Sequence, residues 1–156
     1  MKLNIGCGDD IQQGYINVDI RPKGNIIANV INLPFKTNSV LEVRAIDVYE
    51  HLSFKVSKKV LKEWHRVLKK NGKLYIQTTS LEDLAKYILQ SKNPKKIENA
   101  IARMFGGQTY TENSHFTSGH RMLFNKYLKE LGFKNIKCRC GNFGNRTNMR
   151  VTAIKL

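Results

Sequence analysis

The sequence predicts an α/β protein with a mostly parallel sheet, and three observations support this fold class. A short apolar segment, Lys2–Gly6, runs directly into a turn that carries a second glycine, Gly8. Another short apolar segment ends on the acidic residue Asp19. Strand-like segments then alternate with amphipathic segments of helical period, which is typical of parallel sheets with helical connections. The 156 residues fit a single domain, 1–156.

Seven segments are short and rich in Val, Ile or Tyr, as the strands of a buried or half-buried sheet should be. They are Lys2–Gly6, Tyr15–Ile20, Asn25–Val30, Glu42–Val48, Lys73–Thr79, Lys134–Arg139 and Asn148–Lys155. About eight residues separate the first two segments, whereas a parallel crossover usually needs about a dozen or more. The first crossover helix should therefore be a single turn or absent.

Four segments have a helical pattern: Val56–Lys69, Leu81–Gln90, Pro94–Phe105 and Arg121–Leu131. The first has an apolar stripe at 3.6-residue spacing that includes Trp64. The run 69–72 (Lys-Lys-Asn-Gly) is predicted to stop this helix, with cations at its negative end and a glycine after it. Gly132 should end the last helix in the same way.

Only the loop 140–147 separates the last two predicted strands, which favours an antiparallel hairpin at one edge of the sheet. The prediction is therefore a seven-stranded, mostly parallel sheet with an antiparallel edge strand.

Positive charge is concentrated in the later part of the chain. The formal net charge is +15, but residues 1–50 carry five Lys or Arg against six Asp or Glu. The basic residues of 51–156 would attract polyanions such as RNA. A lysine-rich solvated surface is the alternative interpretation.

The sequence favours a cytoplasmic protein without a metal site. No run approaches the roughly 20 apolar residues of a membrane span, and the N-terminus has no charged-then-apolar signal region. Three cysteines do not suggest a disulfide framework. Cys138 and Cys140 would share one strand face, but a structural zinc site normally has four ligands and no second Cys/His pair faces them. We expect reduced thiols.

The glycine turn and the acid that follows it predict a nucleoside-binding site. Glycines allow the backbone to approach a ligand closely, and a carboxylate accepts hydrogen bonds from ribose hydroxyls. A nicotinamide dehydrogenase would use a similar turn. Here, however, Ile11 occupies the third position of that fingerprint, and Asp19 follows Gly6 after about thirteen residues instead of about twenty.

The same residues resemble class I S-adenosylmethionine-dependent methyltransferases. Residues 4–10 (Asn-Ile-Gly-Cys-Gly-Asp-Asp) are similar to the acidic-x-Gly-x-Gly-x-Gly turn of that family. Asp19 stands where the ribose-binding acid is expected. Residues 29–35 (Asn-Val-Ile-Asn-Leu-Pro-Phe) resemble the Asp-x-x-x-Leu-Pro-Phe segment, whose first residue usually contacts adenine.

Three later segments extend the resemblance along most of the chain. Residues 47–52 (Asp-Val-Tyr-Glu-His-Leu) match the segment after the fourth strand, which commonly contains Leu-Glu-His. Residues 63–74 are close to the family's Glu-x-x-Arg-Val-Leu-Lys-Pro-Gly-Gly run. The segment 151–155 suits a seventh strand that lies antiparallel beside the others. The segment 105–108 (Phe-Gly-Gly-Gln), with a later His115, is similar to a compact branch of these enzymes.

The resemblance implies a Rossmann-like fold and S-adenosylmethionine as the cofactor. It places the methionine part at the glycine turn, the ribose at the acid after the second strand, and the adenine at the following loop. The expected cofactor-binding residues are Asn4, Gly6, Cys7, Gly8, Asp19, Asn29, Leu33 and Glu50.

Methyl transfer needs positioning and, for some acceptors, a base. The candidate catalytic residues are His51, His115 and Tyr49. His51 follows a strand at the edge where open α/β sheets bind ligands, although it could also be a structural histidine at a helix entry. His115 lies in the loop Gly106–Gly119, which could be a lid over the acceptor or a mobile surface loop.

Three residues depart from the family pattern. Asn4 replaces the first acid, Asp10 stands at the third glycine, and Asn29 replaces the adenine-side aspartate. Asp and Asn tolerate positive φ best among non-glycine residues, and Asn29 can still accept a hydrogen bond through its amide oxygen.

The acceptor and the oligomeric state cannot be read from the sequence. Three alternatives stay open: a small-molecule methyltransferase, an RNA methyltransferase that uses the basic second half, and a cofactor-binding protein that has lost catalysis.

Overall fold

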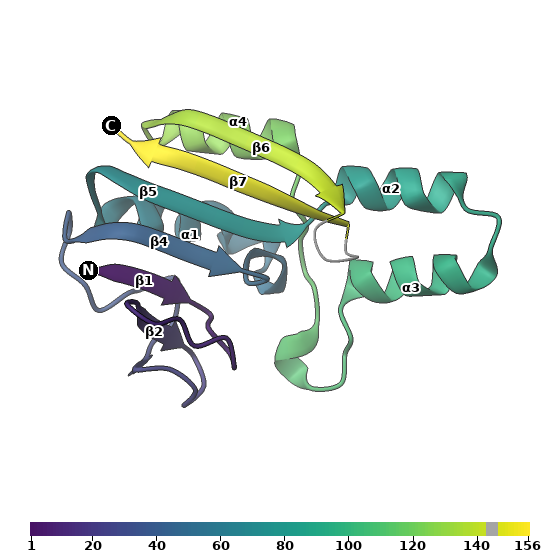
Figure 1. The fold of residues 1–156 in the computed structure, drawn as a ribbon, viewed down its shortest axis with the longest axis horizontal. Helices are drawn as coiled ribbons and strands as arrows, with labels where there is room; N and C mark the ends of the chain where they lie inside the picture. Colours follow the sequence, from purple (N-terminus) through teal and green to yellow (C-terminus); the bar gives the residue numbers. More distant parts are fainter. Residues whose placement is uncertain (143–146) are drawn as a thin grey trace.

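A computed structural model describes residues 1–142 and 147–156, and it contains one seven-stranded sheet (Figure 1). The strand order is β3-β2-β1-β4-β5-β7-β6. β7 runs antiparallel to both of its neighbours, and the other pairs are parallel. The strands are β1 Lys2–Ile5, β2 Ile16–Asp19, β3 Ile26–Ile27, β4 Val40–Ile46, β5 Leu68–Thr79, β6 Phe133–Asn142 and β7 Thr147–Lys155. The predicted α/β fold with a hairpin at one edge is confirmed. The predicted connecting loop, 140–147, lies partly outside the described residues.

Two helices, α1 (Phe54–Val67) and α4 (Arg121–Glu130), lie behind the sheet in the view of Figure 1. They contact each other through an ion pair of 2.7 Å between Lys58 and Glu130. The apolar stripe of α1 is buried, with Trp64 fully enclosed in the core. Burial of this stripe and of the α4 residues Phe124 and Leu128 attaches both helices to one face of the sheet.

The opposite face of the sheet has no helix over it in Figure 1. The described segments 6–15, 20–25 and 28–39, which connect β1 to β2, β2 to β3 and β3 to β4, form turns and irregular chain instead of helices. The predicted loss of the first crossover helix is therefore confirmed, and it extends to the next two connections. The first four strands are short, so turns suffice to join them.

A helical pair projects beyond the carboxyl ends of β4 and β5. It consists of α2 (Leu81–Gln90) and α3 (Pro94–Phe105), which have the predicted bounds and pack against each other. The chain returns to α4 through a loop that contains the short helix η2 (Thr111–Asn113). A bridge between Ser80 and Gly119 closes the base of this insertion. None of the described helices is long and apolar enough to cross a membrane.

Several predicted elements differ from the structure at their ends, and β5 begins at Leu68 instead of Lys73. The first long helix ends at Val67 instead of Lys69, because Leu68 already pairs with Val40 in the sheet. The register then shifts, and Asn71 takes a left-handed conformation at φ 61° inside β5. The Asn-Gly pair therefore forms a strand irregularity and does not cap the helix. The third strand pairs over only two residues, whereas six were predicted. Gly132 ends α4 as predicted, at φ 88°.

The turn after β1 requires glycine at position 6 for two reasons. Gly6 has a φ of 62°, and a Cβ there would overlap the Val48 side chain. Gly14 has a similar φ of 77° but open space around it. A substitution at Gly14 therefore tests backbone strain alone, and a substitution at Gly6 tests backbone strain together with close packing.

We expect Gly14→Ala to lower the free energy of unfolding by about 1–2 kcal/mol through backbone strain alone. Gly6→Ala should cost about 1–3 kcal/mol more, because the added methyl meets a packed side chain. Urea denaturation measures both values. Equal losses for the two variants would show that the Val48 side chain moves away from the added methyl at no cost. In that case the double variant Gly6→Ala/Val48→Ala should be no more stable than Gly6→Ala.

Candidate active site

The glycine turn and Asp19 lie together at the carboxyl ends of β1 and β2. The Asp19 carboxylate accepts hydrogen bonds from the backbone N–H groups of Gly8 at 2.8 Å and Arg21 at 2.9 Å, and from the Arg21 side chain at 3.3 Å. Asp19 is only 4% exposed. Burial raises the pKa of its carboxyl, but these hydrogen bonds outweigh burial and lower the pKa overall. Asp19 is therefore an ionised acceptor directly beside the turn.

Two other predicted residues support the turn from within. The Asn4 side-chain amide donates to the Asp10 carbonyl at 2.7 Å and to Asn17 at 3.0 Å, and its oxygen accepts from Arg44 at 2.7 Å. Cys7 is buried, which raises the pKa of its thiol, and its N–H donates to the Val18 carbonyl at 3.1 Å. The side chain of Asn4 thus holds the turn in place, and both its amide nitrogen and its amide oxygen already make hydrogen bonds within the protein.

The two residues predicted on the adenine side have different surroundings. Asn29 is exposed, and its side-chain oxygen accepts from the Ile31 N–H at 3.0 Å. Leu33 is 3% exposed and packs in the core, while its N–H donates to Glu63 at 2.8 Å. The structure therefore leaves Asn29 accessible and turns the Leu33 side chain inward.

The residues present fit a nucleoside cofactor at this turn. Gly8 has a φ of 49°, and the nearest atom to a Cβ placed there belongs to the long Arg21 side chain, at 3.6 Å. Space therefore remains above the turn, with the ionised Asp19 beside it. A carboxylate in this position is the acceptor that ribose hydroxyls need. The Arg21 guanidinium also lies 5.6 Å from the Tyr110 ring, which connects the turn to the loop after α3.

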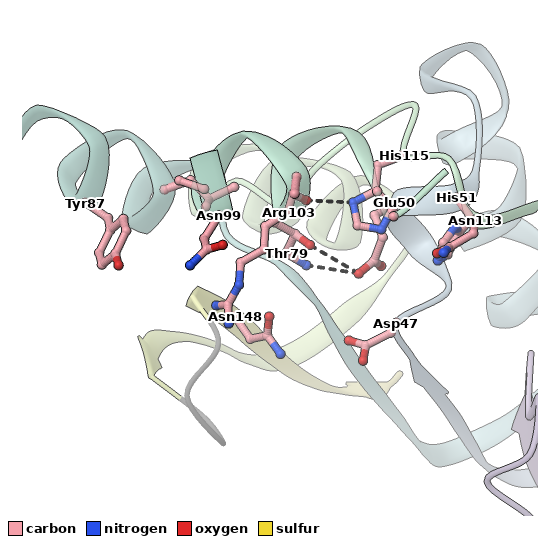
Figure 2. Close-up of a pocket in the computed structure, with 15 residues that line it drawn as sticks. Asp47, Glu50, His51, Thr79, Tyr87, Asn99, Arg103, Asn113, His115 and Asn148 are labelled. Atoms are coloured by element: carbon pink, nitrogen blue, oxygen red, sulfur yellow. Dashed lines mark hydrogen bonds between the residues drawn. The ribbon is translucent and has the colours of Figure 1, made fainter. Parts of the chain in front are cut away.

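A cavity of about 800 Å³ lies next to the turn, between the short helix η1 (Tyr49–His51), α3 and the loop after it. Figure 2 shows polar side chains directed into it from several elements. They come from the end of β4, from η1, β5 and β7, and from α3 with its following loop, and they include Asp47, Glu50, His51, Thr79, Asn99, Arg103, His115 and Asn148.

Glu50 is the most unusual group in the cavity. Its carboxylate is 2% exposed and accepts hydrogen bonds from the Thr78 hydroxyl at 2.8 Å and from the Thr79 N–H and hydroxyl at 3.3 Å. Burial raises the pKa of Glu50 to about 7, with a smaller contribution from nearby Asp47. A carboxyl group with this pKa can exchange a proton near neutral pH.

His51 and His115 pack against each other in the cavity wall, with their ring centroids 4.7 Å apart in an edge-to-face arrangement. The Nδ1 atom of His51 lies 3.1 Å from the Ser114 carbonyl oxygen, and Nδ1 of His115 lies 2.8 Å from that of Arg103. A carbonyl accepts, so each Nδ1 must carry a proton, which leaves Nε2 as the acceptor in a neutral ring. Burial, followed by the neighbouring His51, lowers the pKa of His115.

Tyr49, the third predicted catalytic residue, lies in the hydrophobic core. Its ring is 4% exposed and packs against Phe124 at a centroid distance of 4.8 Å. Burial raises the pKa of the phenol. Tyr49 and Glu50 are neighbours in a short helix, so their side chains diverge, and only Glu50 reaches the cavity. The geometry gives Tyr49 a packing role.

The sequence reasoning missed several cavity residues. Arg103 and Asn99 come from α3, and Asn148 comes from β7, far away in the sequence. No local motif marks them. Asp47 does have a sequence signal, because it opens the segment 47–52 that resembles the family pattern. In the structure it directly follows β4 and has a φ of 51°, which is uncommon for a non-glycine residue.

The two cysteines of β6 lie away from this site. Cys138 and Cys140 are half-buried and pack against the core, and the Cys140 thiol lies 3.4 Å from Glu82. In the described part of the chain, no three His, Cys, Asp or Glu side chains gather in a way that could hold a metal ion.

Comparison with known proteins agrees with this geometry. Residues 3–76 match the family model described as a methyltransferase domain. An uncharacterized protein of Methanocaldococcus jannaschii is 30% identical over 101 residues, which cover 55% of this chain and 44% of the relative. The chain thus spans less than half the length of that curated relative.

Two solved structures share the fold over 99% of the chain. One is a possible exported protein from Bordetella parapertussis, with a TM-score of 0.68, 12% identity and 61% of that chain covered. The other is a SAM-dependent methyltransferase from Archaeoglobus fulgidus, with a TM-score of 0.66, 16% identity and 85% of that chain covered.

Residues 3–76, just under half of the chain, are thus similar to a methyltransferase domain, and the fold is the one seen in a SAM-dependent methyltransferase.

The raised pKa of Glu50 predicts a stability change with pH. A carboxyl whose pKa is about 7 when folded and 4.5 otherwise contributes stability below pH 4.5 and loses it as the pH rises through 7. Glu50→Gln should therefore gain on the order of 2 kcal/mol relative to wild type between pH 5 and pH 8. Denaturant titrations at the two pH values measure this difference.

Glu63→Gln is the matched control, because hydrogen bonds from the Arg66 side chain lower the pKa of Glu63. Its sign is opposite: the stability that ionised Glu63 contributes is present above pH 4.5 and is lost as the pH falls below 4.5, so the difference between this variant and wild type should stay constant between pH 5 and pH 8. A pH-independent difference for Glu50→Gln would contradict the assignment of a perturbed carboxyl at position 50.

Proposed function

We propose that this protein transfers a methyl group from S-adenosylmethionine to an acceptor bound in the cavity between η1, α3 and the loop 106–119. One observation carries the proposal. A buried carboxyl group, Glu50, has a pKa of about 7 and lies in η1, just after β4. Gly6 of the cofactor turn packs against Val48, two residues before Glu50. The cofactor turn and the acceptor cavity are therefore adjacent.

In the proposed complex, Asp19 accepts hydrogen bonds from the ribose hydroxyls, and the backbone of residues 6–8 lies along the methionine part. Asn29 is the adenine-side residue, since it is exposed and has an amide oxygen. Each Asp19 carboxylate oxygen has two lone pairs, so ribose binding does not require the loss of the Gly8 hydrogen bond. The Arg21 side chain, which is less tightly held, can move aside.

S-adenosylmethionine supplies a methyl group on a sulfonium, and the leaving group is neutral S-adenosylhomocysteine. The protein must orient the acceptor in line and take its proton when the nucleophile carries one. Glu50 can accept that proton in its ionised form. His51 or His115 can accept it at Nε2, since Nδ1 of each faces a backbone carbonyl. Arg103 and the two amide residues of the cavity would hold the acceptor's polar groups.

The acceptor has more than one candidate class. The polar cavity, enclosed by α3 and its loop, supports a small polar molecule, and here the loop 106–119 would act as a lid. Loss of catalysis with retention of cofactor binding is the alternative suggested by Asn4 and Asp10.

We also propose a cytoplasmic location, supported by three unpaired cysteines. Cell fractionation that finds the protein only outside the cytoplasm would contradict this location.

The cofactor site is tested by calorimetric titration with S-adenosylmethionine, S-adenosylhomocysteine and NAD. Both sulfur ligands should bind and NAD should not. Asp19→Asn should weaken binding of the sulfur ligands by about 10- to 100-fold, as expected when a charge-assisted hydrogen bond of about 1.5–3 kcal/mol is lost. The control is Asp9→Asn, which removes the same charge from an exposed, Lys23-paired residue of the same turn. Equal affinity in wild type and Asp19→Asn would remove Asp19 from the site.

Catalysis is tested with S-adenosylmethionine labelled in its methyl group, incubated with a small-metabolite mixture or with total RNA. Label in either fraction identifies the acceptor class, and cofactor binding without transfer would support the inactive alternative. With an acceptor in hand, the rate should rise with pH through about 7 as Glu50 ionises. Glu50→Gln should flatten this profile and lower turnover by about 100-fold or more at saturating cofactor. An unchanged profile would exclude Glu50 as the base.

A further inference from the structure

The helix-free face of the sheet has an ordered pattern of side chains. Cross-strand partners stand on the same face, so the register defines rows across the strands. Tyr75 pairs with Thr152, which pairs with Lys137. One row toward the carboxyl end of β5, Gln77 pairs with Arg150, which pairs with Arg139. One row in the other direction, Lys73, Ile154 and Lys134 are partners.

These rows point away from the helices. The intervening residues, such as Ile76, Val151 and Cys138, belong to the core or pack against it. Since side chains alternate along a strand, the residues of the rows lie on the face opposite α1 and α4. Lys137 and Arg139 are exposed, and Tyr75 is half-buried. Figure 1 shows this face of β5, β7 and β6 uncovered.

The face is strongly basic over β5, β7 and β6, and it becomes mixed in charge at β4, where Glu42 pairs with Lys73 and Arg44 pairs with Tyr75. Across the three rows on β5, β7 and β6 there are five cationic side chains, Lys73, Lys134, Lys137, Arg139 and Arg150, and no acidic one among the described residues. Arg150 also donates to Gln77 at 3.0 Å, which holds it along the sheet.

We propose that this face, defined by the three rows on β5, β7 and β6, binds single-stranded nucleic acid. Cations that surround an aromatic ring on an open sheet provide phosphate contacts and a stacking surface for an unpaired base. Tyr75 occupies the middle row, with Lys73 and Gln77 on either side of it on the same face of β5. A duplex has no free base faces, so it would use the cations but not the ring.

The face also leads to the cavity. Thr79 pairs with Asn148 in the next row beyond Gln77 and Arg150, and both Thr79 and Asn148 line the cavity. A nucleic-acid strand that runs over the sheet from the Tyr75 row toward Thr79 and Asn148 therefore reaches the cavity. The inference goes beyond the proposed methyl transfer and does not depend on it, because binding is measured without cofactor.

The test is fluorescence anisotropy with labelled 12-residue oligouridylate, oligothymidylate and a duplex of equal length. The apparent Kd for both single strands should rise steeply with salt as counterions are released. Replacing Lys137, Arg139 and Arg150 by Gln should weaken binding about tenfold or more and lower the salt slope. Tyr75→Leu should weaken single-strand binding about 5- to 100-fold through lost stacking and leave duplex binding unchanged.

The matched control replaces Lys55, Lys59 and Lys62 by Gln, which removes the same charge from exposed positions on α1, on the opposite side. It should change the Kd by less than about threefold if binding is local to the open face. Equal losses for the two triple variants would overturn the proposal in favour of diffuse attraction. So would single-strand binding that is insensitive to Tyr75→Leu, or an absence of binding at low salt. Thermal unfolding confirms that each variant is folded.

Discussion

The active edge of this protein depends on the buried Glu50. Its carboxylate is held by Thr78 and Thr79 at the end of β5, and its carbonyl accepts the N–H groups of Phe116 at 2.8 Å and Thr117 at 3.2 Å. One residue thus joins the end of β4, the end of β5 and the loop that returns from α3. A buried carboxyl group is costly unless its hydrogen bonds are made. A buried carboxyl group that is held by hydrogen bonds at a cavity wall is typical of functional groups.

The same edge couples the two halves of the site. Val48 fills the space above Gly6, so the cofactor turn rests on the segment that leads into Glu50. On the cavity side, the paired rings of His51 and His115 connect η1 to the loop after α3. A displacement of this loop would therefore reach both histidines and, through the contact of Tyr110 with Arg21, the side chain that is bonded to Asp19.

The second distinctive feature of this chain is the sheet face that the described helices leave uncovered. The first three crossovers are turns, so the sheet keeps helices on one face only. Parallel sheets are usually covered on both faces. Here the uncovered rows are occupied by Lys, Arg, Gln, Thr and Tyr, which tolerate water, and by the half-buried Ile154, while alternate residues such as Ile76 and Val151 supply the core. The same alternation that stabilises the fold creates the basic face.

Local sequence patterns determined the fold class, most element bounds and the position of the cofactor turn, because strand composition, helical period and glycine turns are encoded by neighbouring residues. They also pointed to Glu50, His51 and His115. Only the tertiary structure turned Tyr49 into the core, raised the pKa of Glu50 and brought Asn148 to the cavity. Burial, pKa and cross-strand neighbours depend on segments that are distant in sequence, so no local pattern specifies them.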